Sequence, residues 1–252
     1  MKLKICFLFI SILFTGCAST SLNRVGFTST FERSLNTKSH GYNVIKDPTG
    51  SAPSELVERF EVRAGDCSRD SVWSDCENAR ERSEIASERM TFIGKEEKYS
   101  WYMYVPTDWK DVTPAAAMHG QFSQTNKSNS KSYSAPLLGI QLTNRGIHVE
   151  NYLKDKKSNI YDIDKVKGKW TKIEVRAKWL MEVDGVMPDG FFKVYINDEL
   201  LYEYEGNTVS SYGIDEIRFK YGIYRARLHL LGGSTPPTQI VYYANVKREQ
   251  IK

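Results

Sequence analysis

Apolar and polar residues alternate along much of the chain, as they do in β-strands that bury one face. The clearest run covers residues 170–179, where Ile173, Val175 and Ala177 alternate with polar and charged side chains. Further alternating or apolar runs predict strands over residues 56–63, 79–88, 98–105, 118–123, 137–142, 147–153, 191–196, 200–204, 219–225 and 239–246. No convincing helix longer than two turns is indicated. The pattern predicts an all-β fold, a two-sheet β-sandwich or jelly roll.

The strand over residues 219–225 carries most of the functional interpretation. It is expected to turn an apolar face to the core and a polar face outward, because side chains alternate along a strand. The apolar face holds Phe219, Tyr221 and Ile223, and the polar face holds Arg218, Lys220 and Tyr224, with a gap at Gly222. Two cations and a phenol in a row favour an anionic ligand.

One other segment is ambiguous. Residues 79–88 contain several Arg and Glu, which are good helix formers. Their charge density leaves little apolar stripe, so a strand is favoured, with Arg80, Arg82 and Glu84 on one side. The segment 154–169 is rich in Lys and is expected to be a solvated loop that could guide a polyanion.

The first 16 residues have the features of a signal peptide, with Lys2 and Lys4 ahead of a short apolar run. The run ends in Phe14-Thr15-Gly16-Cys17, which resembles a bacterial lipobox with Phe in place of the usual Leu. This resemblance implies cleavage before Cys17, a lipid anchor on Cys17, and a place in the cell envelope as an outer-membrane lipoprotein or in the periplasm. An ordinary secretory signal is the alternative.

The rest of the chain divides into two parts. Residues 17–50 are rich in Ser, Thr and Asn and are expected to form a tether with a candidate edge strand. Residues 51–252 are expected to form one β-jelly-roll domain, because sandwiches of this length are commonly single domains.

Charge and cysteine usage narrow the function classes. Loss of the signal removes two lysines and no acid, so the net charge falls from +4 to +2. Such a balance argues against nucleic acid as a partner. Apart from the lipid site Cys17, two cysteines remain after loss of the signal, Cys67 and Cys76. In an oxidising compartment they are expected to form a disulfide.

The sequence contains no nucleophile elbow, HExxH, P-loop, dinucleotide-binding turn or EF-hand loop. What remains is a set of cationic, amide, imidazole and phenol groups on predicted strands: Arg82, His119, Gln121, Lys220, Tyr224 and Arg225. His119, Gln121 and Ser123 are expected to share one face of their strand.

Three motifs together resemble the jelly-roll polysaccharide lyases, the concanavalin-like group of heparin lyase I-like, glucuronan lyase and alginate lyase enzymes. They are Arg82-Ser83-Glu84-Ile85, His119-Gly120-Gln121-Phe122, and the run from Phe219 to Arg225. Their order and spacing agree with the family from about residue 55 to 246. The resemblance implies a concave sheet that forms a glycan groove, and cleavage of a uronate-containing acidic polysaccharide by β-elimination.

The resemblance also implies roles for individual residues. Gln121 and Arg82 would neutralise the substrate carboxylate. Tyr224 and His119 are the candidates for proton transfer. The substrate-binding candidates are Lys220, Arg225, Arg218 and Glu84, and Lys220 and Arg225 would help the Tyr224 phenol to ionise.

One position departs from the family pattern. Alginate lyase-like enzymes place a His two residues after the central Gln, where this chain has Ser123. His119 could substitute as base, Tyr224 could act as both base and acid, or the site could be inactive in a glycan-binding lipoprotein. A glycoside hydrolase ranks last, because no paired-carboxylate pattern is present. No cofactor is expected, although a structural Ca²⁺ is compatible with the family, and the expected protein is a monomer.

Overall fold

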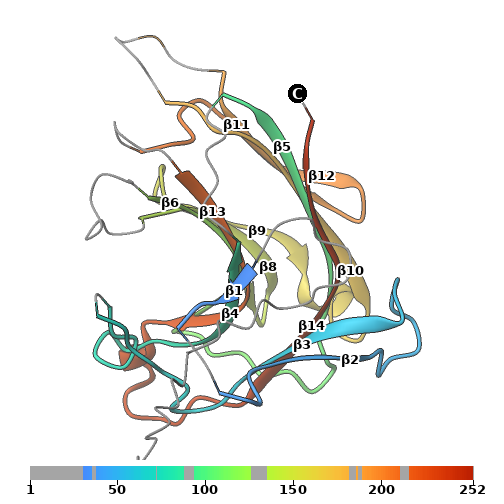
Figure 1. Ribbon diagram of the computed structural model, residues 1–252, viewed down its shortest axis with the longest axis vertical. Helices are drawn as coiled ribbons and strands as arrows, with labels where there is room; N and C mark the ends of the chain where they lie inside the picture. Colours follow the sequence, from blue (N-terminus) through green and yellow to red (C-terminus); the bar gives the residue numbers. More distant parts are fainter. Residues whose placement is uncertain are drawn as a thin grey trace, which may run out of the picture.

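The computed structural model describes residues 31–35, 38–71, 73–87, 94–125, 135–181, 186, 189–210 and 216–251. Within these residues the chain forms two seven-stranded antiparallel sheets that pack face to face (Figure 1). This arrangement confirms the all-β sandwich that the alternation predicted. The predicted signal peptide (residues 1–16), the predicted lipid site Cys17 and residues 126–134 lie outside the described residues.

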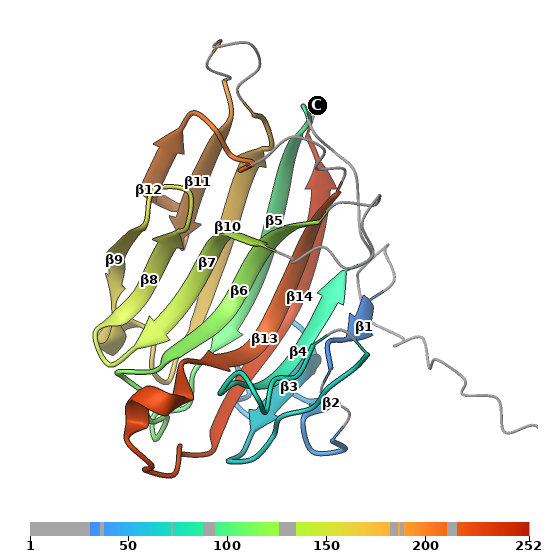
Figure 2. The same cartoon turned by 90° about the vertical axis from the view of Figure 1, so that its left-hand side faces the viewer.

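The first sheet carries the predicted functional strands, and Figure 2 views it face on. Its strands are, in spatial order, β1 (Phe31–Arg33), β4 (Glu81–Ser87), β13 (Glu216–Ala226), β6 (Ala116–Thr125), β7 (Ala135–Thr143), β8 (Gly146–Asn151) and β9 (Lys156–Asp162). The three motif strands β4, β13 and β6 are therefore direct neighbours, although they are far apart in sequence.

The second sheet lies behind the first. Its strands are, in spatial order, β12 (Glu199–Glu205), β11 (Phe191–Ile196), β10 (Trp170–Lys178), β5 (Glu96–Tyr104), β14 (Gln239–Gln250), β3 (Leu56–Val62) and β2 (Tyr42–Lys46). Two short 3-10 helices, η1 (Ile163–Lys165) and η2 (Leu228–Leu231), complete the described elements. No helix of the described part is long and apolar enough to cross a membrane.

Aromatic side chains fill the space between the sheets. Phe219 and Tyr221 of β13 point inward and contact Trp101 of β5 and Phe60 of β3, with ring centroids 5.4 and 5.6 Å apart respectively. All four are at most 1% exposed. The apolar side of β13 therefore faces the core as predicted, and its polar side faces out of the sandwich.

Two strands were missed by the sequence interpretation. Strand β2 (Tyr42–Lys46) lies in the expected tether, and β9 (Lys156–Asp162) lies in the expected loop 154–169. Most of the β9 side chains are exposed, as expected of an edge strand with little apolar surface. The segment 79–88 is a strand over Glu81–Ser87, as favoured.

A β-bulge interrupts the pairing of β13 with β6. Tyr221 pairs with Gly120 and Tyr224 pairs with Met118, so Gly222 and Ile223 lie opposite the single residue His119. The pairing of β6 with β7 is irregular at the same place. A bulge of this kind breaks the alternation of side chains along the strand.

The expectation that His119 shares a face with Gln121 is therefore wrong. His119 is 1% exposed and lies in the core, where its Nδ1 is 3.5 Å from the Tyr243 hydroxyl of the opposite sheet. Gly120 also faces inward, because a Cβ there would contact the Trp101 ring. Gln121 then returns to the outer face.

Candidate active site

Four of the predicted residues meet on the outer face of the first sheet. Tyr224 on β13 pairs with Arg82 on β4, and Lys220 on β13 pairs with Gln121 on β6. Residues that pair across antiparallel strands have side chains on the same face. The sheet register thus brings the phenol, the guanidinium, the amide and the amine together, as the three motifs predicted.

The Tyr224 phenol is surrounded by two guanidinium groups. Arg80 Nη1 donates a hydrogen bond to the Tyr224 hydroxyl oxygen, and the Arg82 guanidinium lies 4.4 Å from the centre of the tyrosine ring. Burial raises the pKa of Tyr224, while the charges of Arg82 and Arg80 oppose that shift. The Tyr224 hydroxyl oxygen thus accepts from one cation while a second cation lies over the tyrosine ring.

Arg82 is itself held by protein carboxylates. Its Nε and Nη2 donate to the two carboxylate oxygens of Asp75, at 2.5 and 2.6 Å, and its Nη1 donates to Glu84 at 3.3 Å. Burial alone would lower the pKa of Arg82, but the Asp75 hydrogen bonds and the Glu84 charge raise it. Arg82 is 5% exposed, so it has little surface left for a substrate carboxylate, contrary to the expected role.

Glu84 occupies the centre of this face. Its side chain is 2% exposed and accepts a hydrogen bond from the Gln121 amide as well as from Arg82. An internal carboxylate therefore already contacts the two groups expected to bind the substrate carboxylate. Glu84 organises these donors, and its own expected contact with substrate is not supported by the geometry.

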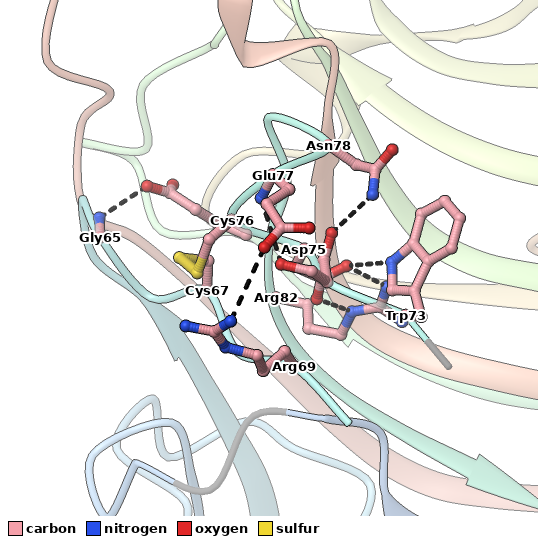
Figure 3. Close-up of a disulfide and its surroundings, with 11 residues drawn as sticks. Gly65, Cys67, Arg69, Trp73, Asp75, Cys76, Glu77, Asn78 and Arg82 are labelled. Atoms are coloured by element: carbon pink, nitrogen blue, oxygen red, sulfur yellow. Dashed lines mark hydrogen bonds and ion pairs between the residues drawn. A yellow bond between two sulfur atoms is a disulfide. The ribbon is translucent and has the colours of Figure 1, made fainter. Parts of the chain in front are cut away.

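The disulfide loop supplies Asp75. Cys67 and Cys76 are joined by a disulfide, as predicted, and Figure 3 shows Asp75 inside the closed loop with its carboxylate directed at Arg82 and at the Trp73 indole. Trp73 Nε1 donates to Asp75 at 2.9 Å. The backbone N–H of Arg80 donates to the Asp75 carbonyl, also at 2.9 Å.

Two further cations lie on the outer face of β13. Burial lowers the pKa of Lys220 to about 8, although the Glu84 charge opposes the shift. Arg218 forms an ion pair with Glu32 of β1 and donates from Nε to the Ser87 carbonyl. Lys220 thus lies on the outer face beside Gln121, whereas Arg218 is partly engaged by Glu32 and Ser87.

Arg225 does not lie on this face. Its side chain is fully buried, pairs with Glu81 and donates to the Pro237 carbonyl. The strand alternation continues past Tyr224 and turns Arg225 inward, so the expectation that it binds substrate or acts on Tyr224 is wrong.

Ser123 lies at the position where the family pattern has His. It is 3% exposed, and its Oγ is buried and makes no hydrogen bond to the part of the chain that the structure describes. Burial lowers the pKa of His119 to about 3, although a hydrogen bond with the Gly222 carbonyl opposes the shift. Position 123 therefore supplies a hydroxyl in place of an imidazole, and the His119 imidazole is buried away from this site.

Sequence reasoning missed Arg80 and Trp73. Arg80 is not among the candidate site residues of the sequence, yet it contacts the Tyr224 hydroxyl and lies 5.3 Å from the centre of a Trp73 ring. Its place just before the Arg82 motif, on the same side of an expected strand, was the available signal.

A second polar cluster on the outer face was also missed. Lys157 on β9 donates to the Gln141 amide oxygen on β7, and His148 on β8 lies 2.8 Å from Thr143. Burial, followed by the charges of Lys157 and Arg145, lowers the pKa of His148 to about 4. This cluster extends the polar surface across the sheet.

No group of three or more potential His, Cys, Asp or Glu metal ligands occurs among the described residues. The candidate site consists of two guanidiniums around a phenol, an amide, and an amine.

The fold resembles those of solved polysaccharide lyases. The endo-β-1,4-glucuronan lyase of the fungus Trichoderma reesei superposes with a TM-score of 0.62 at 15% identity, over 86% of this chain and 90% of that one. The family 7 alginate lyase A1-II′ gives 0.60 at 10% identity, over 87% and 92%. The marine alginate lyase AlyA1 of Zobellia galactanivorans gives 0.54 at 14% identity, over 88% and 93%.

No curated protein sequence matches the chain. The polysaccharide lyase family profile, however, matches residues 23–247, which include all three motif strands and both sheets except the end of β14. The chain therefore belongs to the polysaccharide lyase family.

Proposed function

We propose that this lyase cleaves a uronate-containing acidic polysaccharide by β-elimination, with Tyr224 as the group that transfers the proton. The observation that carries the proposal is the contact of the Tyr224 hydroxyl with Arg80, beneath the Arg82 guanidinium. Two cations beside one phenol favour both an anionic substrate and a transient phenolate.

The proton balance can be met by Tyr224 alone. As a phenolate it takes H5 of the uronate, and the electron pair of the C5–H bond forms the C4=C5 double bond while the C4–O4 bond breaks. The phenol then returns the proton to the leaving O4. This syn elimination uses no second base, which suits a site where His119 is buried and the family position is Ser123.

Gln121 and Lys220 are proposed to face the substrate. They pair across β6 and β13 on the same side as Tyr224. Amide and ammonium donors stabilise the negative charge that develops on the uronate as H5 is removed. Arg218, at the sheet edge, is proposed to contact a neighbouring sugar.

We further propose that the enzyme works in the bacterial cell envelope, anchored through a lipid on Cys17 and acting as a monomer. The Cys67–Cys76 disulfide supports an oxidising compartment. The glucuronan and alginate lyases that share the fold support acidic polysaccharides as the substrates to be tested.

The test is an activity assay on glucuronan, alginate and heparin. It is monitored through the absorbance of the unsaturated product near 235 nm. Wild-type protein should generate this band on at least one polymer. Tyr224→Phe should lose about 10²- to 10⁴-fold in kcat, because general acid–base groups contribute on that order. Tyr242→Phe is the matched control, since Tyr242 is half-buried on the other sheet, where β14 pairs with β3.

A competing function is a glycan-binding protein without catalysis, and the replacement of the family His by Ser123 favours it. It predicts that acidic glycans bind, as measured by calorimetry, but that no polymer gives the 235 nm band. A band of equal growth in Tyr224→Phe would instead leave elimination intact and remove Tyr224 from the mechanism.

A further inference from the structure

Within the part of the chain that the structure describes, Arg80 differs from the other arginines around the site in having no acidic partner. Among the described residues, no carboxylate lies within ion-pair distance of its guanidinium, whereas Arg82, Arg218 and Arg225 each pair with an acid. The Arg80 Nε is buried and makes no hydrogen bond to the described part of the chain. A guanidinium has five N–H donors in a planar fork that suits a carboxylate.

Aromatic rings hold Arg80 in place of an acid. Its guanidinium carbon lies 5.3 Å from a Trp73 ring centre and 5.6 Å from the Tyr224 ring centre. Cations are attracted to the faces of aromatic rings, so the charge is stabilised while its N–H groups stay available to an anion.

The disulfide loop fixes this arrangement from behind. Asp75 accepts from the Trp73 indole through its carboxylate and from the Arg80 backbone through its carbonyl, and the Asp75 N–H donates to the Ser68 carbonyl at 2.9 Å. Cys76, the next residue, is tied to Cys67 (Figure 3). Trp73 and Arg80 are thus both anchored to one buried residue.

From these contacts we infer that Arg80 is the catalytic residue that neutralises the substrate carboxylate, and that Arg82 is an internal support for Tyr224. This inference rests on the proposed function and reassigns a role that the motif had given to Arg82. A carboxylate bound to Arg80 lies beside the phenol oxygen that the same guanidinium contacts. Since the carboxylate carbon is bonded to C5, this contact brings H5 to Tyr224.

The test compares a uronate polymer with its methyl ester, in which the carboxylate is neutral and needs no cation. Arg80→Met should lose about 10²- to 10³-fold in kcat on the acidic polymer, as when one preorganised donor to a developing charge is removed. On the ester the loss should be much smaller. Arg69→Met is the matched control, because Arg69 lies in the same loop and is exposed; it should change neither rate.

A binding measurement makes the test independent of turnover. A glucuronan tetrasaccharide should bind Arg80→Met at least tenfold more weakly than wild type, while its methyl ester should bind both proteins equally. An equal loss on acid and ester, in rate or in binding, would overturn the role of Arg80. The same selective loss in a folded Arg82→Lys variant, with Arg80→Met unaffected, would return the role to Arg82.

These outcomes stay separate from those that decide the proposed function. A wild-type protein that binds the acidic tetrasaccharide through Arg80 but never forms the 235 nm band contradicts the lyase mechanism and leaves Arg80 as the carboxylate contact. Circular dichroism of each variant confirms that the sandwich is folded.

Discussion

At the scale of single residues, His119 illustrates how burial removes a group from the chemistry. Its ring lies between the two sheets near Tyr243 and Trp109, and its Nε2 has no hydrogen-bond partner in the described structure. Protonation would place an uncompensated charge in an apolar core, which explains the pKa of about 3. The imidazole is therefore neutral under ordinary conditions.

This burial makes stability depend on pH. In the unfolded chain His119 has an ordinary pKa near 6.5, so below that pH the unfolded state binds a proton that the folded state rejects. The burial of His119 therefore costs almost no free energy of unfolding above about pH 6.5. Below that pH it lowers the free energy of unfolding increasingly as the pH falls towards 3. At pH 5 this loss amounts to about 2 kcal/mol.

We expect His119→Phe to lose about 2 kcal/mol less stability than wild type between pH 7 and pH 5, as measured by urea unfolding at each pH. Its kcat at neutral pH should stay within a few-fold of wild type. If the folded variant instead lost activity by 10²-fold or more, as removal of a general base would cause, the assignment of His119 to the core would be wrong.

At the scale of elements, the bulge in β13 explains why the motif contains a glycine. Gly222 has φ of +128°, and a Cβ there would contact the Ser83 carbonyl oxygen and come within 2.8 Å of Phe60. The Tyr243 hydroxyl lies 2.8 Å from the carbonyls of both His119 and Gly222. The backbone conformation and these close contacts therefore require a glycine at position 222, in addition to the gap that Gly222 leaves between polar side chains.

Gly222→Ala should therefore cost more stability than the same change at an open glycine. Gly232 is the control, because its φ is +59° and nothing lies within 4 Å of a Cβ there. Backbone strain of about 1–3 kcal/mol is common to such positions, and the contacts at Gly222 should add at least about 1 kcal/mol. If the two variants lost equal free energy of unfolding in denaturant, the bulge would tolerate a side chain. A fall in kcat in Gly222→Ala alone would show that the bulge positions Tyr224.

At the scale of the whole molecule, polar groups cross the outer face of the first sheet from β4 to β9. Tyr224, Met118, Gln141 and His148 form one cross-strand row, as their pairings show. The Lys157 amine contacts Gln141 on β7. Strand β7 is two strands away from the Tyr224 strand β13, so the two strands lie ~10 Å apart at the usual strand spacing. A polymer that crosses the strands from Tyr224 would reach this amine, but a single sugar ring would not.

Lys157→Gln should raise KM for a long acidic polymer several-fold at low salt while kcat stays unchanged. Short oligosaccharides should be affected less, and the difference should shrink at high ionic strength, because an exposed charge is screened. Lys156→Gln is the control, since Lys156 is also exposed. It pairs with Asn151, whose amide contacts Tyr202 of the other sheet, so it is not aligned with the row of Gln141 and His148. An identical effect of the two variants would reduce the role of Lys157 to general charge.

The sequence by itself determined the sandwich and the faces of β13, because side-chain alternation is a local property of an extended chain. Phe219, Tyr221 and Ile223 are buried, while Lys220 and Tyr224 lie on the outer side, as the alternation predicted. The resemblance of the three motifs also pointed to Arg82, Gln121 and Tyr224 as site residues, which the structure places on neighbouring strands. The Cys67–Cys76 disulfide followed from the expected compartment.

Only the tertiary structure decided which of these groups are available for chemistry. A bulge set by the β13–β6 pairing turned His119 inward. Alternation alone puts Arg225 on the inner side of β13, but the tertiary structure supplied Glu81 as its buried partner. Asp75, brought in by the disulfide loop, engaged Arg82 and left Arg80 beside Tyr224 without an acid among the described residues. The physical reason is that ion pairing depends on groups from distant segments, which no local pattern in the sequence records.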